Sequence, residues 1–180
     1  MPASEKTNKR NKKSGVNNEK IKYSHPFHGS PRRLHGITVW AASPHFLFCS
    51  ASGVNSDGSL NACFKIAGLG DNQTLTVTAS ASADAVYACR NRGEQCPNGA
   101  NKVEVQADVS ASGTFTSGRS GQITACLMVE PPPTELTCPN GQRLVLVSIS
   151  YTNVSVSAPG AGDCETSPGT FSANFFPNCP

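Results

Sequence analysis

The chain has 180 residues, of which 15 are Lys or Arg, 12 are Asp or Glu and eight are Cys, and its formal net charge is +3. This length allows one ordinary domain and a tail. Residues 1–33 hold nine basic and two acidic residues (net +7), so the other 147 residues hold six basic and ten acidic ones (net −4). Because the basicity belongs to the tail, it gives no reason to expect that the folded body binds nucleic acid.

The N-terminal segment, residues 1–40, is rich in Asn, Lys, Ser and Pro at its start and has no hydrophobic period. Such a composition does not offset its ordering entropy, so we expect a disordered basic leader. A nuclear address is the alternative for its KRNKK run. The stretch PRRLHGITVWAASPHF has the rough order of a signal peptide, but Pro44 and His45 interrupt the apolar run. We interpret the leader as a targeting remnant or as sequence upstream of the true start.

Eight cysteines are spread over the body and absent from the leader: Cys49, Cys63, Cys89, Cys96, Cys126, Cys138, Cys164 and Cys179. An even number at wide spacing predicts disulfides and an oxidising compartment. Structural zinc, the alternative, usually requires closer pairs than CRNRGEQC, the tightest spacing in this chain. We therefore expect a secreted, extracellular protein. No stretch approaches the roughly 18 to 20 apolar residues of a membrane span.

From Phe46 onward, short alternating segments are separated by turns rich in Gly, Pro, Asn and Asp. Apolar and polar residues alternate at 59–68, 74–82, 102–113, 121–130 and 143–157, which predicts half-buried strands. About seven strands with a turn roughly every ten residues predict an all-β, antiparallel, immunoglobulin-like sandwich. We expect the sandwich at 41–160 and a Cys-containing C-terminal extension, 161–180, packed on it.

Two details of the alternation are specific. Leu60, Ala62, Phe64 and Ile66 share the expected core face, so Cys63 points to the opposite face, as Cys126 does in its own segment. The two cysteines could link neighbouring strands across one sheet if those strands pair in register. In 143–157 the alternation slips by one residue near Thr152 and Asn153, which predicts a β-bulge.

Several elements resemble a family of small secreted, mainly bacterial β-sandwich proteins. The resemblance covers about residues 44–157, and its most specific elements are FKIAGLG at 64–70 and CPNGQ at 138–142 followed by SYTN at 150–153. It implies secretion behind a signal peptide that ends just before His45, and it implies no activity. The chain departs from the family in its basic leader and its C-terminal extension, and the extension suggests an added disulfide between Cys164 and Cys179.

The sequence offers no catalytic motif. The histidines lie in or beside the leader, so the strands hold no imidazole base for a nucleophile: His25, His28, His35 and His45. A glycoside hydrolase would need two carboxylates that converge in a cleft, whereas the acids lie mostly at turns or on solvent-exposed faces: Asp71, Asp84, Glu94, Asp108 and Glu130. We expect no catalytic residue, cofactor or metal site. A secreted hydrolase is the second alternative.

The first alternative is a carbohydrate-binding module, because such domains stack sugar rings on exposed aromatic side chains. FSANFFPNC is the aromatic cluster outside the main strand pattern, so Phe171, Phe175 and Phe176 are the candidate ligand-binding residues. The same residues could simply pack across an open sheet edge. The main hypothesis is a secreted, non-enzymatic protein that acts through its surface on an extracellular macromolecule, either a protein or a polysaccharide, in matrix, adhesion, competition or host contact.

Overall fold

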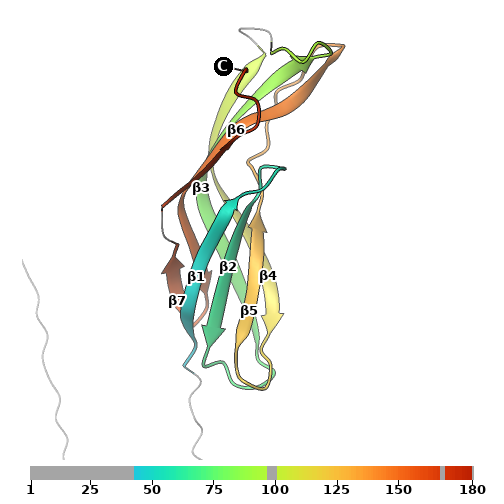
Figure 1. Ribbon diagram of the computed structural model, residues 1–180. Coiled ribbons are helices and arrows are strands. Elements are labelled where there is room, and N and C mark those ends of the chain that lie inside the picture. Colours follow the sequence, from blue (N-terminus) through green and yellow to red (C-terminus); the bar gives the residue numbers. More distant parts are fainter. Residues whose placement is uncertain (1–42, 97–100, 167–168, 180) are drawn as a thin grey trace, which may run out of the picture. The chain divides into compact units, whose positions relative to one another are not determined.

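The computed structural model describes residues 43–96, 101–166 and 169–179 (Figure 1). The predicted leader, with His25, His28 and His35, lies outside these residues. His45, which was expected outside the strands, is instead the first residue of the first strand, at its exposed end. The described residues form eight strands and no helix, so none of them belongs to a helix that could cross a membrane.

The strands form two antiparallel sheets, which confirms the predicted all-β sandwich. Sheet A has the order β1 (His45–Val54), β2 (Leu60–Ala67), β5 (Ile123–Val129). Sheet B has the order β4 (Lys102–Thr116), β3 (Thr74–Asn91), β6 (Gln142–Ala158), β7 (Gly162–Glu165), and β8 (Thr170–Asn174) also pairs with β6. Part of the C-terminal extension therefore belongs to sheet B.

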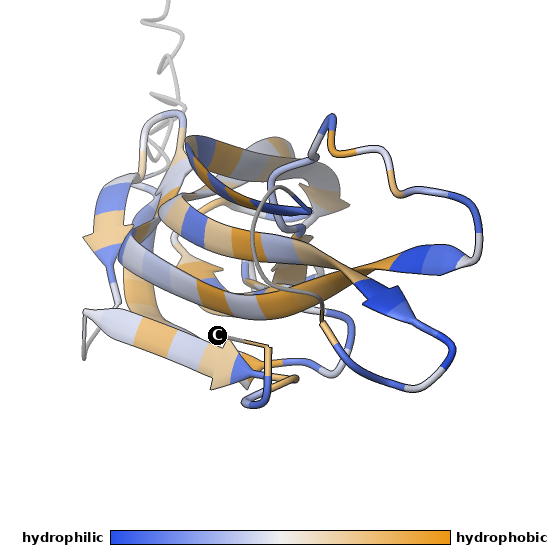
Figure 2. Ribbon diagram, turned by 90° about the horizontal axis from the view of Figure 1, so that it is seen from above, coloured by the Kyte–Doolittle hydropathy of each residue, from blue (hydrophilic) through white to orange (hydrophobic). Residues whose placement is uncertain are grey.

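The core lies between the inner faces of the two sheets. Hydropathy alternates along the strands in Figure 2, as a sheet with one buried face requires. On β2 the four predicted core residues, Leu60, Ala62, Phe64 and Ile66, are fully buried. The Phe64 ring meets the edge of Phe115 from β4 at a centroid distance of 5.3 Å. Burial of each large side chain contributes about 1.5–3 kcal/mol, so β2 and β5, which each bury three of them, both anchor sheet A to the core.

The predicted bulge in β6 is present. Ser80 of β3 pairs with Ser155 and Ser82 pairs with Thr152, so two residues of β6 oppose one residue of β3. Asn153, one of these two residues, has a φ of 53°. Asn tolerates this left-handed backbone better than most residues do. The bulge restores the phase, because residues on both sides of it still face the core.

Beyond the end of sheet A, β3 and β6 continue into the upper part of Figure 1. There the inner face of sheet B is covered by the segment 130–141, which the Cys89–Cys138 disulfide anchors. The Tyr87 hydroxyl donates a hydrogen bond of 2.6 Å to the carbonyl of Pro132 in this segment. A disulfide-anchored segment thus replaces the second sheet.

The outer face of the same part of sheet B is covered by the end of the chain. Phe176 and Cys179 pack against Ala88 and Val147 in a second, small core cluster. The Phe176 backbone N–H donates to the Val147 carbonyl at 3.3 Å. A disulfide to Cys96, in the turn after β3, holds Cys179 in place.

All eight cysteines form disulfides, as the sequence predicted: Cys49–Cys164, Cys63–Cys126, Cys89–Cys138 and Cys96–Cys179. The bond between Cys63 and Cys126 joins directly opposed residues of β2 and β5, which confirms the expected link across one sheet.

The suggested disulfide between Cys164 and Cys179 is wrong. Cys164 on β7 lies opposite Val156 of β6, whereas the end of the chain is hydrogen-bonded near Val147. Nine residues of extended strand separate these positions by roughly 30 Å. Cys164 instead bonds to Cys49 of β1 and so links the two sheets.

Candidate binding surface

The outer face of sheet B carries a regular polar surface. Odd-numbered β3 residues between 77 and 85 are buried, so the even-numbered residues point away from the core. We define the polar face as the even-numbered residues of 74–84 on β3 and 104–116 on β4, together with Ser148, Ser150, Thr152, Ser155 and Ser157 on β6. Apart from two acids and a glutamine on β4 and one acid on β3, every side chain in this set is a hydroxyl.

Cross-strand hydrogen bonds order the hydroxyls at one end of the polar face. Directly opposed residues in an antiparallel pair have Cβ atoms about 4.5–5.5 Å apart, which brings short hydroxyl side chains into contact. The hydroxyl oxygens are 3.2, 3.4 and 2.8 Å apart in three successive pairs, Thr74–Thr116, Thr76–Thr114 and Thr78–Ser112. The result is a regular array of groups that both donate and accept hydrogen bonds.

Three carboxylates meet near the middle of the polar face. Asp84 of β3 is directly opposite Gln106 of β4, so Glu104 and Asp108 occupy the two diagonal positions, about 7–8 Å away. The Gln106 Nε2 lies 3.1 Å from Glu104 Oε1 and 3.5 Å from Asp84 Oδ2, so one amide donates toward both acids. The Ser82 hydroxyl donates to Asp108 at 2.9 Å.

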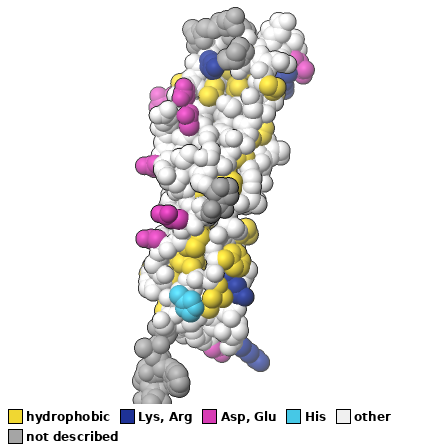
Figure 3. Space-filling view, turned by 60° about the vertical axis from the view of Figure 1, so that its left-hand side comes forward, with side chains coloured by type: hydrophobic (Ala, Val, Ile, Leu, Met, Phe, Trp, Pro, Cys, Tyr) yellow, Lys and Arg dark blue, Asp and Glu magenta, His cyan; other side chains and the backbone are white. Residues whose placement is uncertain are grey.

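A shallow depression of about 500 Å³ contains two of these carboxylates, Asp84 and Asp108, and is bordered on β6 by Ser150 and Thr152. The polar face as defined contains no Lys or Arg, and Lys102, the next even-numbered residue of β4, lies at its border. In Figure 3 the acidic side chains follow one side of the visible surface, and the Lys and Arg side chains lie toward its ends. The face can therefore accept hydrogen bonds from a partner and attract positive charge. Among the described residues, no group of three or more His, Cys, Asp or Glu is arranged to hold a metal ion.

The three candidate phenylalanines do not form one cluster. Phe171 of β8 pairs with Tyr151 of β6 and packs against the main core. Phe175 and Phe176 border a different depression, of about 400 Å³, whose other lining residues are Ser56, Asp57, Val145 and Leu146. Phe171 is therefore not part of the smaller site, which we define as the depression bordered by Phe175 and Phe176.

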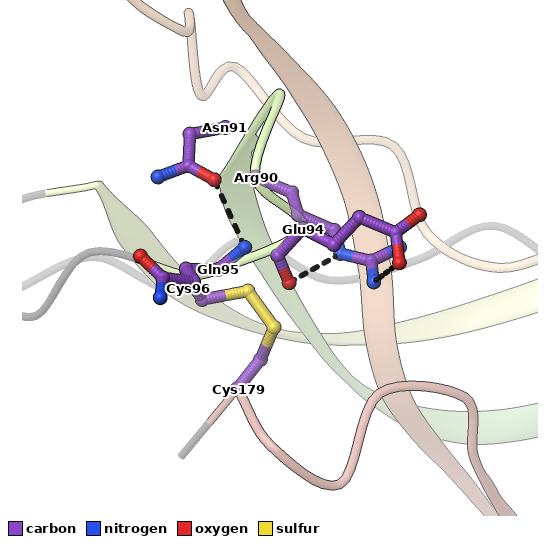
Figure 4. A network of polar contacts seen from close by, with 6 residues as sticks. All are labelled: Arg90, Asn91, Glu94, Gln95, Cys96 and Cys179. Carbon is purple, nitrogen blue, oxygen red and sulfur yellow. Dashed lines mark hydrogen bonds and ion pairs between the residues drawn. A yellow bond between two sulfur atoms is a disulfide. The ribbon is translucent and has the colours of Figure 1, made fainter.

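This smaller site has little free aromatic surface. The Arg90 guanidinium lies over the Phe176 ring, 4.6 Å from its centroid. Arg90 is fixed in turn by Glu94, whose carbonyl accepts from Nε at 3.0 Å and whose carboxylate is 3.3 Å from the guanidinium (Figure 4). The Cys96–Cys179 disulfide lies beside this pair and ties the same turn to the end of the chain.

Asp57, the acid of the smaller site, is already engaged. It accepts hydrogen bonds from the backbone N–H and the hydroxyl of Ser59, at 2.9 and 2.6 Å. These bonds, the hydroxyl first, lower the pKa of the Asp57 carboxyl from its ordinary value. The carboxylate therefore stabilises the turn between β1 and β2.

The sequence placed Asp84 and Asp108 among acids at turns or on solvent-exposed faces, but it did not bring them together. The proximity of Asp84 and Asp108, and the contacts that Gln106 makes with Asp84 and Glu104, depend on the register of β3 against β4. No local pattern in the sequence specifies this register. The matching alternation of 74–84 and 104–116 was the available signal, because two segments with the same alternation and similar length are candidates for pairing.

The fold and the surface define a disulfide-linked antiparallel β-sandwich with one polar outer sheet face. No family model and no curated protein matches the chain. A solved structure of the sporulation control protein Spo0M from Bacillus subtilis aligns with 9% identity and a TM-score of 0.25, over 72% of this chain and 49% of the Spo0M chain. A similarity at that level carries no argument about fold or function.

Proposed function

We propose that the protein is a secreted, non-enzymatic domain that binds an extracellular protein through the polar face. The observation that carries this proposal is the combination of ordered hydroxyls and three neighbouring carboxylates on the polar face. Carboxylates only accept hydrogen bonds, so the complementary partner surface is rich in Lys and Arg.

Four disulfides support the extracellular location, because disulfides form and persist in oxidising compartments. We propose that a signal sequence ahead of His45 directs secretion. We also propose an immunoglobulin-like arrangement. Its support is that the connections from β2 to β3, from β4 to β5 and from β5 to β6 each pass from one sheet to the other.

A charge-reversal experiment tests the proposed binding surface. The full chain, immobilised in its oxidised form, is incubated with the secreted proteins of its native culture, and retained proteins are identified by mass spectrometry. Asp84→Lys combined with Asp108→Lys should weaken binding of the retained partner at least about tenfold, because two attractive charges become repulsive. The control is Glu135→Lys, which reverses an exposed acid outside the polar face. Equal binding by both variants would contradict the proposal.

Carbohydrate binding is the second candidate, favoured by the depression between Phe175 and Phe176. A glycan array and cell-wall polysaccharides test it directly. Saturable binding that Phe175→Ala and Phe176→Ala abolish, and that the charge-reversed variant keeps, would replace the protein partner with a sugar.

A hydrolase is the third candidate, since Asp84 and Asp108 line one depression from diagonal positions on β3 and β4, and glycosidases use paired carboxylates. The depression is shallow and open on a sheet surface, which does not exclude water from a reaction. We expect no turnover of glycoside, ester or peptide substrates. Turnover that Asp84→Asn and Asp108→Asn each abolish would identify an enzyme.

A further inference from the structure

The free edge of sheet B is long and regular. Among the described strands, β4 pairs with β3 alone, so the other side of its 15 residues carries unpaired backbone N–H and C=O groups. Such an edge is a template for another strand unless a proline, a bulge, charged side chains or short length block it.

The other edges carry these blocking features. β1 has two register shifts in its pairing with β2. β5 has seven residues, and three consecutive prolines, 131–133, follow one residue after its end. β7 and β8 have only four and five residues. β4 has no proline and no register shift over its pairing with β3. Its charged residues are the terminal Lys102 and two acids, Glu104 and Asp108, so the register of an added strand must keep these acids from facing other acids.

The inner side of β4 is incompletely buried. Val105 and Val109 are half-buried and Ala107 is exposed, whereas the β3 residues paired with them, at 81, 83 and 85, are buried. An added strand would cover these apolar side chains and would pair the free backbone groups at the same time. One added strand would therefore both pair the free backbone edge of β4 and bury its inner side chains.

We propose that this neighbour is β4 of a second copy, paired antiparallel about a two-fold axis at Val109, the midpoint of Lys102–Thr116. This register uses the whole strand and faces odd residues with odd and even residues with even, so apolar residues meet on the inner side. Asp108 lies opposite Ser110 of the second copy, and Glu104 lies opposite Thr114. The contact between Asp108 and Ser110 repeats the serine–aspartate hydrogen bond already present between β3 and β4.

Charge disfavours one neighbouring register, and strand length disfavours the other, since an axis at Ser110 would leave Lys102 and Val103 without partners in the strand. With the axis at Val109, no acid faces another acid, and Lys102 faces Thr116. With the axis at Asp108, the two Asp108 carboxylates of the copies would face each other, which is destabilising. The pairing makes sheet B continuous across both copies and joins their two polar faces into one surface, so a repetitive partner would be bound bivalently.

Sedimentation velocity of the oxidised full chain over a concentration series tests the pairing. We expect a reversible dimer. Ser110→Asp with Thr114→Glu places acids opposite Asp108 and Glu104 of the other copy, so it should weaken the dimer at least about tenfold. Both positions are exposed, and thermal unfolding checks that the variant folds.

Two further variants fix the interpretation. Exchanging the two residues, Asp108→Ser with Ser110→Asp, restores an acid opposite a hydroxyl and should restore the dimer. Thr76→Asp adds a charge to the polar face on the inner strand β3 and should leave dimerisation unchanged. A wild-type chain that is monomeric throughout the series, a dimer that the acidic variant leaves intact, or open-ended polymers would each overturn the proposal. Because no binding partner is present, the result is independent of the proposed function.

Discussion

At the residue scale, Tyr151 forms a buried hydrogen bond between the two sheets, in addition to the Cys49–Cys164 disulfide. Its side chain on β6 is fully buried, and its hydroxyl donates a hydrogen bond of 2.8 Å to the carbonyl of Gly58, in the turn between β1 and β2. Gly58 has a φ of 91°, and a Cβ at this position would collide with Leu146, so only glycine suits the turn that presents this carbonyl. One polar contact thus fixes the sheet A turn to the centre of sheet B.

Removing the hydroxyl should therefore destabilise the fold. Tyr151→Phe leaves the Gly58 carbonyl without this donor, at a cost of about 1–3 kcal/mol in the free energy of unfolding. Tyr87→Phe is the matched control, since its hydroxyl also donates to a carbonyl but lies at a partly exposed position where water can take its place. Urea denaturation measures both, and an equal loss in the two variants would contradict the role given to Tyr151.

The same tyrosines predict a dependence on alkaline pH. Burial raises the pKa of Tyr151 well above its ordinary value of 10.0 and raises that of Tyr87 in the same direction. The unfolded chain then ionises first, so the contribution to stability is complete below the unfolded pKa and is lost as the pH rises above about 10. The free energy of unfolding should fall more steeply above this pH in the wild type than in Tyr151→Phe. Parallel curves would show that Tyr151 titrates alike in both states.

At the element scale, the disulfides differ in what they hold. The Cys63–Cys126 bond joins β2 and β5, which are already paired over seven residues. The Cys96–Cys179 bond holds the end of the chain over the outer face of sheet B, next to Ala88 and Val147. The Cys63–Cys126 bond thus reinforces strands that are already hydrogen-bonded, whereas the Cys96–Cys179 bond keeps the C-terminal residues packed on sheet B.

Removing each bond should consequently have a different local effect. Cys96→Ala with Cys179→Ala should cost about 2–4 kcal/mol in stability and should release residues 175–179, with faster amide exchange at Ala88 and Val147. Cys63→Ala with Cys126→Ala should cost a similar amount without local opening, because the ladder remains. Hydrogen exchange decides between the two patterns, and slow exchange over 175–179 in the first variant would contradict the covering role.

Which residues of each strand face the core was predictable, because the alternation of apolar and polar residues can be read within each segment. Leu60 to Ile66 alternate into the core as predicted, and the slip near Asn153 identified the bulge from sequence alone. The partner of Cys164 was not predictable, since it depends on which half of β6 each C-terminal strand joins. The carboxylates of the polar face were invisible as a group for the same reason, because the pairing of Asp84 with Gln106 is a matter of register.

At the scale of the whole molecule, the stability of the fold depends on disulfides and therefore on an oxidising environment. The inner residues of β3 are mostly alanines, so this core is thin, and disulfides add stability that apolar burial does not supply. Such a chain keeps its fold where thiols are oxidised, which is where we propose that the polar face binds an extracellular protein. Reduction of the four disulfides should unfold or strongly destabilise the protein.

Recovering the protein from its native culture and measuring its location and thiol state tests the central claim of an extracellular, disulfide-linked binding domain. Alkylation without reduction, followed by peptide mapping, should find the protein outside the cell with no free thiol and with the pairs Cys49–Cys164, Cys63–Cys126, Cys89–Cys138 and Cys96–Cys179. A protein confined to the cell interior with its cysteines alkylated would contradict the account.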